Sequence, residues 1–148
     1  ELVLSDLPNW EAQDRAQNAF LAFLDWADRT GLTLSKSELP LVSEKNRYGG
    51  TLDINVLTIR GRLCIGDFKT SNAIYADHVI QVCGGYRPLY AEHFPDEPLD
   101  QGAYIFQFNQ NTGDFREQHF MDTTGAEQAF LHMRALYDLM QELEKRVK

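Results

Sequence analysis

The sequence predicts an α/β fold, a central mixed β-sheet flanked by helices, with the element order α-β-β-β-α-β-β-α. Apolar residues recur at helical spacing near both ends of the chain, which indicates two amphipathic outer helices. Strand-length apolar runs, separated by turn residues, fill the region between these helices. A helix-length segment interrupts the strands, as is typical of a sheet that carries helices on its faces.

The boundaries follow from turn residues and from the change between the helical and the strand period. Gly31 ends the first helix, and Arg60-Gly61 predicts a tight hairpin turn. Gly84-Gly85 and Pro88 are expected to weaken or bend the middle helix. The expected elements are a helix over 10–29, an extended segment over 32–42, strands over 48–59 and 62–69, a helix over 73–90, a loop over 93–101, strands over 103–108 and 115–121, and a helix over 125–147.

The last helix carries a stripe of large apolar residues on one face, which we interpret as part of the core. Thr123-Thr124 can cap its first turn. The residues of the stripe are Phe130, Met133, Leu136, Tyr137, Met140 and Leu143.

The composition is that of a soluble globular protein, and 148 residues suit a single domain over 1–148. No apolar run approaches the roughly 20 residues of a membrane span, so we expect no membrane partner. Cys64 and Cys83 are expected to be buried free thiols, which suits a reducing cytoplasm. The chain begins with Glu1 rather than Met, so we expect it to be a fragment or a trimmed chain.

The net charge of −8 argues, taken alone, against a nucleic-acid partner. The charge is unevenly distributed, however, since residues 29–90 contain eight Lys or Arg and five Asp or Glu. Because phosphate contact depends on local charge, this basic middle segment is compatible with DNA binding.

The pattern that carries chemistry joins two acidic residues to a lysine. Asp53 is expected in one strand and Asp67 near the end of the next, so a hairpin can bring the two carboxylates together. Two such carboxylates repel each other unless a cation lies between them, and hard oxygen ligands suit Mg²⁺ or Mn²⁺. Residues at i and i+2 of a strand share a face, so Lys69 is expected beside Asp67, with Phe68 on the opposite, apolar face. A metal and a lysine here are sufficient for phosphodiester hydrolysis.

The run Gly50-Thr-Leu-Asp53, followed by Asp67-Phe-Lys69-Thr70, resembles the RecB-type exonuclease branch of the PD-(D/E)XK nuclease superfamily. This branch includes phage and CRISPR-associated exonucleases and the mitochondrial genome-maintenance exonuclease. It has G-x-x-D on one strand, D-x-K-T on the next, and then a helix with Q-x-x-x-Y. The resemblance covers residues 38–86 and implies a restriction-endonuclease-like core. It also implies a Mg²⁺- or Mn²⁺-dependent deoxyribonuclease, an exonuclease of recombination, repair or phage DNA metabolism.

By this resemblance, Asp53 and Asp67 are metal ligands and Lys69 is the catalytic lysine. The backbone carbonyl of Phe68 can also reach the metal in such sites, and Glu38 resembles a glutamate that joins the metal shell. Relatives often have an N-terminal helix with a histidine ligand. No histidine precedes Glu38, so we expect that the chain lacks this element.

The third motif matches with altered spacing, because Gln81 is followed by a tyrosine five residues later, Tyr86. On a regular α-helix these two residues do not share a face. Either the glycine pair Gly84-Gly85 distorts the helix, or Tyr86 is not the motif tyrosine. Gln81 is therefore the stronger candidate for the catalytic set.

Further candidates for substrate contact are Thr70, Ser71, Tyr86, His78 and Arg47. Each has an ordinary alternative. A surface role for His78 and a solvated charge for Arg47 remain open.

Alternatives also remain for the main site. Glu38 can be a solvated strand residue, Asp53 a strand-edge charge, and Asp67 with Lys69 an exposed ion pair at a strand end. At the level of function, the alternatives are a structure-specific or restriction-type endonuclease and a catalytically silent DNA-binding module of the same fold.

Overall fold

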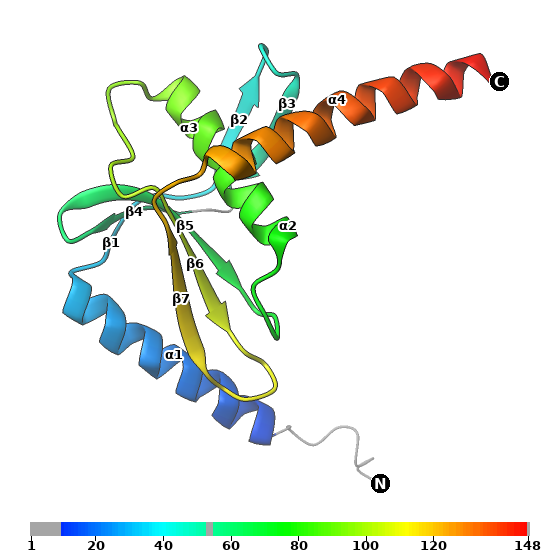
Figure 1. Cartoon of the computed structure of the whole chain (residues 1–148). Helices are drawn as coiled ribbons and strands as arrows, with labels where there is room; N and C mark the ends of the chain where they lie inside the picture. The colour runs from blue at the N-terminus through cyan, green and yellow to red at the C-terminus, as the bar shows by residue number, and fades with distance from the viewer. Residues whose placement is uncertain (1–9, 53–54, 148) are drawn as a thin grey trace, which may run out of the picture.

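The computed structural model describes residues 10–52 and 55–147. A five-stranded mixed sheet has the strand order β1-β4-β5-β6-β7, and β2 and β3 form a separate two-stranded sheet. Strands β5 and β6 pair in parallel, whereas the other neighbours in the large sheet are antiparallel. The predicted α/β class, a mixed sheet flanked by helices, is thus confirmed (Figure 1).

The elements follow one another along the chain with short connections. They are α1 (Trp10–Thr30), β1 (Thr33–Lys36), β2 (Leu39–Ser43), β3 (Tyr48–Leu52), β4 (Asn55–Ile59), β5 (Arg62–Lys69), α2 (Ala76–Val79), the π-helix η2 (Ile80–Tyr86), α3 (Arg87–His93), β6 (Ala103–Phe108), β7 (Phe115–Phe120) and α4 (Thr124–Arg146).

The predicted element order is wrong before the middle helix, where five strands replace the expected three. The extended segment 32–42 is divided into β1 and β2, and the strand over 48–59 into β3 and β4. In each case the two halves belong to different sheets. The physical reason is that an apolar run shows which residues are buried, but not which strand they pair with.

The hairpin between β4 and β5 forms at the predicted turn. Arg60 has a φ of 51° and Gly61 a φ of 76°, so both central residues adopt the left-handed conformation of a type I′ turn. This turn sets the register, which pairs Ile59 with Arg62 and continues to Asn55 opposite Gly66. Asp67 therefore lies one residue beyond the last pair that the described residues form in this hairpin.

Helices cover both faces of the large sheet (Figure 1). Helix α1 packs on one face, where Trp26 belongs to a core cluster with β4, β5 and β6. Segments η2 and α3 pack on the other face, with Val82, Cys83 and Leu89 in a second core cluster. Alternate residues of β5 supply the two clusters, since Cys64 belongs to the first and Ile65 to the second.

Helix α4 departs from the expectation for the last helix. Its first turns pack against η2, but none of its residues is buried, and it extends outward from the rest of the chain (Figure 1). The prediction that its apolar stripe belongs to the core is wrong. Met133, Leu136 and Tyr137 are each more than half exposed, because no described element covers that face. Thr123 precedes the helix without capping it through its side chain, and its hydroxyl donates instead to Glu127.

In the part of the chain that the structure describes, the long helices contain too many polar residues to cross a lipid bilayer.

Candidate functional site

The candidate site is built on the last residues of β5. Phe68 points toward α1, where its ring lies 5.5 Å from that of Phe23. Asp67 and Lys69 point to the other side of the sheet, and Lys69 Nζ lies 2.8 Å from Asp67 Oδ2. Strand alternation therefore gives the predicted arrangement, an acid and an amine on one face with an aromatic ring on the other.

The ion pair is held from the neighbouring helix. Lys69 Nζ donates to Gln81 Oε1 at 2.9 Å, and Gln81 Nε2 donates to the Tyr86 hydroxyl at 2.9 Å. A continuous polar chain thus runs from Asp67 through Lys69 and Gln81 to Tyr86. Because Gln81 accepts from the ammonium group, it fixes one of the three donors of Lys69 and limits where the amine can lie.

The five-residue spacing of Gln81 and Tyr86 is explained by a π-helix over Ile80–Tyr86. A π-helix forms hydrogen bonds between residues five apart, so residues i and i+5 come to the same face. Gly84-Gly85 lies inside this segment. Of the two alternatives raised by the sequence, the structure shows a helix that is distorted at the glycine pair, with Tyr86 directed toward Gln81.

The glycine pair also lets α4 approach closely. A Cβ atom on Gly84 would lie 2.2 Å from the carbonyl oxygen of Ala126, and one on Gly85 would lie 2.8 Å from the Phe130 ring. Tyr48 donates its hydroxyl to the Gly85 carbonyl at 2.8 Å, and desolvation raises the pKa of this tyrosine to about 12. Contacts with α4 and with Tyr48 thus hold the π-helix on two sides.

Asp67 is a buried carboxylate that is paired with Lys69. Its residue surface is 7% exposed, and its Oδ2 is buried. Lys69 lies within ion-pair distance of this oxygen, but the angles do not make a hydrogen bond, and no other described residue donates to it. Lys69 already supplies one cation to this carboxylate, and a buried carboxylate oxygen is also a ligand type that Mg²⁺ accepts. The alternative of an exposed strand-end ion pair does not describe Asp67, because it is buried.

Asp53 and Glu38 are the other two side chains that were predicted as metal ligands. Asp53 lies outside the described residues. Glu38 is exposed, has a φ of 52°, and directly precedes Leu39, which pairs with Leu52. Within residues 10–52 and 55–147, no three Asp, Glu, His or Cys side chains form a group able to hold a metal. Of the predicted metal ligands, the structure therefore describes Asp67, Phe68 and Glu38 but not Asp53.

A small cavity of about 200 Å³ adjoins Gln81 and Tyr86. Gly50, from the predicted G-x-x-D motif, lines it, and a Cβ there would lie 3.5 Å from the Tyr86 ring. The three sequence motifs thus meet in space, since Gly50 lies beside Tyr86 and Gln81 bonds to Lys69. Tyr48 also lines this cavity and was not predicted, because a lone aromatic residue at a strand start gives no functional signal.

Thr70 and Ser71 are both placed near the end of β5, but in different surroundings. Thr70 lines a cavity of about 570 Å³ on the α1 side, together with Arg15 and Phe20. The Ser71 hydroxyl donates to Ala73 O within its own loop at 2.7 Å. Gln107, a buried residue that the prediction did not single out, donates to Ser71 O at 2.8 Å and so holds this loop. The sequence feature that could have singled out Gln107 is its position as a polar residue within the apolar strand 103–108.

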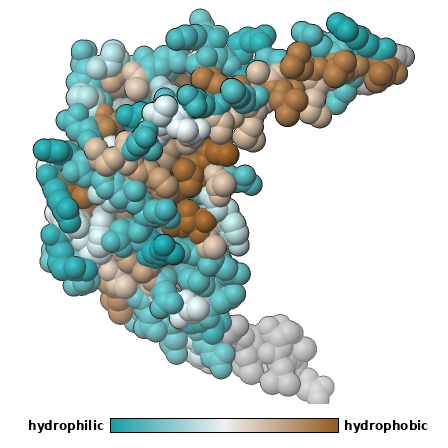
Figure 2. Space-filling model, in the orientation of Figure 1, coloured by the Kyte–Doolittle hydropathy of each residue, from teal (hydrophilic) through white to brown (hydrophobic). Residues whose placement is uncertain are grey.

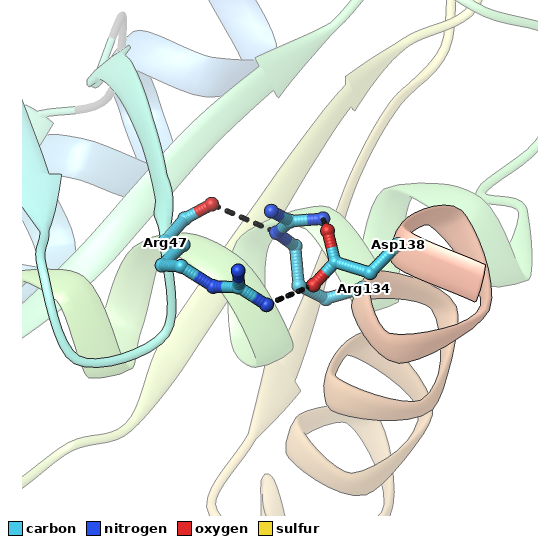
Figure 3. Close-up of polar contacts among 3 residues, drawn as sticks. All are labelled: Arg47, Arg134 and Asp138. Atoms are coloured by element: carbon cyan, nitrogen blue, oxygen red, sulfur yellow. Dashed lines mark hydrogen bonds and ion pairs between the residues drawn. The ribbon is translucent and has the colours of Figure 1, made fainter. Parts of the chain in front are cut away.

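His78 and Arg47 are held by contacts of their own. His78 Nδ1 lies 3.3 Å from the backbone nitrogen of Tyr75, and the two rings are 5.4 Å apart. Arg47, in the β2–β3 turn, forms an ion pair with Asp138 of α4, and Arg134 donates to Arg47 O at 2.8 Å (Figure 3). These contacts fasten the two-stranded sheet to α4.

The basic excess of residues 29–90 is largely neutralised by ion pairs. Arg29, Lys36, Arg47, Lys69 and Arg87 each lie within 4.0 Å of a carboxylate, and the partners are Asp25, Glu97, Asp138, Asp67 and Glu127. Three basic residues of this segment, Lys45, Arg60 and Arg62, have no carboxylate within this distance among the described residues, so the charge pattern alone gives only limited support for a DNA-binding surface.

Cys64 and Cys83 are buried free thiols, as predicted. Burial raises the pKa of Cys64 to about 12 and that of Cys83 to about 11. Both are therefore uncharged and poor nucleophiles at neutral pH, and neither takes part in the candidate site.

Comparison of the chain with protein-family models and with curated proteins gives no match.

Proposed function

We propose that this chain carries the active site of a Mg²⁺- or Mn²⁺-dependent nuclease that hydrolyses phosphodiester bonds of DNA. The observation that carries the proposal is the buried Asp67 carboxylate, paired at 2.8 Å with a lysine that also donates to Gln81. A core ion pair without further function is usually completed by hydrogen bonds. Among the described residues, Asp67 Oδ2 makes no hydrogen bond in addition to its ion pair with Lys69.

Each residue has a separate part in this proposal. Asp67 would hold the cation through its buried carboxylate, with the Phe68 carbonyl and Asp53 as the further ligands that the motif resemblance implies. A divalent ion in this place supplies an activated water and neutralises the phosphate. Lys69 orients that water or stabilises charge on the phosphate, and Gln81 keeps the amine at the site through its hydrogen bond.

The motif resemblance supports DNA as the substrate and cleavage from an end. We place the activity in recombination, repair or phage DNA metabolism, in a reducing compartment that suits the two buried thiols. An endonuclease of the same superfamily differs in one direct respect, since it also cuts closed circular DNA. Degradation of linear DNA with protection of a circular form would support the exonuclease.

The test is cleavage of a labelled linear duplex and a labelled single strand in the presence of Mg²⁺ or Mn²⁺. EDTA should stop the reaction, and Asp67→Asn and Lys69→Ala should each lower the rate by about 10²- to 10⁴-fold. The matched controls are Asp100→Asn and Lys45→Ala, which make the same chemical changes at exposed positions. Circular dichroism should show that all four variants stay folded. Full activity of folded Lys69→Ala would remove this lysine from the mechanism.

Gln81 gives a second test, which separates positioning from folding. Gln81→Ala removes the partner of Lys69, whereas Tyr86→Phe leaves this hydrogen bond and removes only the next one. We expect Gln81→Ala to lower the cleavage rate more than Tyr86→Phe, with little change in melting temperature for either, since Gln81 is exposed. Equal activity of Gln81→Ala and the unmodified protein would contradict the positioning role.

A further inference from the structure

Helix α4 presents a continuous apolar face to solvent. It has 23 residues and none of them is buried. Figure 2 shows apolar residues gathered along this helix, which extends away from the other elements. Seven large apolar side chains near its outer end are at least half exposed: Met133, Leu136, Tyr137, Leu139, Met140, Leu143 and Val147. A face of this kind marks an interaction surface, because water contact with so much apolar area is unfavourable.

The spacing of the face is that of a coiled-coil seam. Positions separated alternately by four and three residues form an unbroken apolar series: Ala129, Met133, Leu136, Met140, Leu143 and Val147. Tyr137 and Leu139 flank this seam on its two sides. A seam with this alternation fits packing along its length against one other helix.

We infer that α4 pairs antiparallel with α4 of a second copy of this chain. In one antiparallel register every seam residue meets another seam residue, so that Ala129 faces Val147, Met133 faces Leu143, and Leu136 faces Met140 of the other copy. The flanking Tyr137 and Leu139 then each lie beside their own counterpart at the two-fold axis. Such a self-complementary patch is what a closed two-fold interface requires.

The exposed area is sufficient for a dimer. Seven half-exposed side chains at roughly 100 Å² each offer about 700 Å² per copy, close to the about 800 Å² per partner of a stable interface. The antiparallel direction also sets the two helix dipoles in opposition, which is favourable, and keeps the two sheets at opposite ends of the helix pair.

The charges at the two ends of α4 agree with this direction. The last turn carries Lys145 and Arg146. The other end lies beside Asp77, which lines a small cavity together with Phe130 and Met133. The antiparallel register brings Lys145 and Arg146 of one copy toward the Asp77 end of the other copy, whereas a parallel pair sets each of these charges beside its own counterpart.

Sedimentation velocity over a range of concentrations tests the pairing. We expect a species of twice the 17.0 kDa chain mass at concentrations on the order of 10 μM. Leu136→Glu with Met140→Glu should give the single-chain mass. Gln128→Glu with Ala135→Glu adds the same charge to the same helix outside the seam and should leave the dimer intact. Unchanged helical circular dichroism would show that both double variants are folded. A single-chain mass for the unmodified protein, or a dimer that survives the seam substitutions, would overturn the inference.

Cysteine cross-linking tests the direction. Leu139→Cys should form a disulfide between copies, because Leu139 meets its counterpart only in the antiparallel pair. Leu136→Cys should not, because Leu136 faces Met140 of the other copy. Cys64 and Cys83 are buried and do not compete. Cross-linking of Leu136→Cys in place of Leu139→Cys would show a parallel pair and overturn the proposed register. Neither result depends on nuclease activity.

Discussion

Gly84→Ala tests whether the close approach of η2 and α4 depends on the glycine pair. The added Cβ would lie 2.2 Å from Ala126 O and 2.7 Å from Ala126 C, where ordinary contact begins at 3.4 Å. Both neighbours are backbone atoms of α4, so no side-chain rotation can relieve the overlap. The two helices must separate by roughly 1 Å, and a change of this size in a packed interior costs about 1–3 kcal/mol.

Part of this cost is offset in the unfolded state. Replacing a glycine by alanine reduces the freedom of the unfolded chain and contributes about 0.4–1 kcal/mol of stability. The net loss for Gly84→Ala is therefore about 0–2.6 kcal/mol, which lowers the melting temperature by up to about 10 °C in a domain of this size.

Gly125→Ala is the matched control, because it makes the same substitution in α4 where no atom lies within 4 Å of the new Cβ. It should raise the melting temperature or leave it unchanged. Thermal unfolding followed by circular dichroism compares the two variants. If Gly84→Ala were as stable as Gly125→Ala, the reasoning about this helix contact would be wrong.

Three further outcomes are expected. The two buried thiols, Cys64 and Cys83, should resist a thiol reagent in the native protein at neutral pH and react fully after unfolding, since burial raises the pKa of both; rapid reaction of the native protein would contradict their burial. Hydrogen bonds from Lys36 and Tyr90 lower the pKa of Glu97 below 4.5, so its contribution to stability is present above that pH and is lost as the pH falls through the lowered value. The melting temperature of the unmodified protein should therefore fall more steeply on acidification than that of Glu97→Gln. If the two melting temperatures fell in parallel, the ionised Glu97 would not contribute to stability. DNA affinity should depend weakly on salt, with a log–log slope of magnitude about 1–2, because most basic residues of the segment 29–90 are paired; a slope several times larger would reveal an unrecognised phosphate-binding surface.

The sequence predicts best the features that follow from strict alternation. Strand β5 is predicted with its observed bounds, and so is the placing of Asp67 and Lys69 on one face with Phe68 on the other. Here a period of two and a run of buried residues leave a single arrangement. The I′ turn at Arg60-Gly61 is equally local, and it fixed the hairpin that leads to Asp67.

Features that depend on tertiary contact were not predictable in this way. The relation of Gln81 to Tyr86 needs a π-helix, and a spacing rule based on the α-helix cannot reveal one. The split of segment 48–59 between two sheets depends on strand partners. The apolar stripe of α4 shows which face avoids water, but a period of 3.6 cannot show whether the covering surface belongs to the same chain.

The most direct test of the proposed metal site is a Mn²⁺ titration of the purified protein by calorimetry, without DNA. We expect Mn²⁺ binding that Asp67→Asn weakens by at least about tenfold and that Asp100→Asn leaves unchanged. Equal Mn²⁺ affinity of the folded Asp67→Asn variant and the unmodified protein would contradict it, because the buried oxygen of Asp67 would then hold no cation.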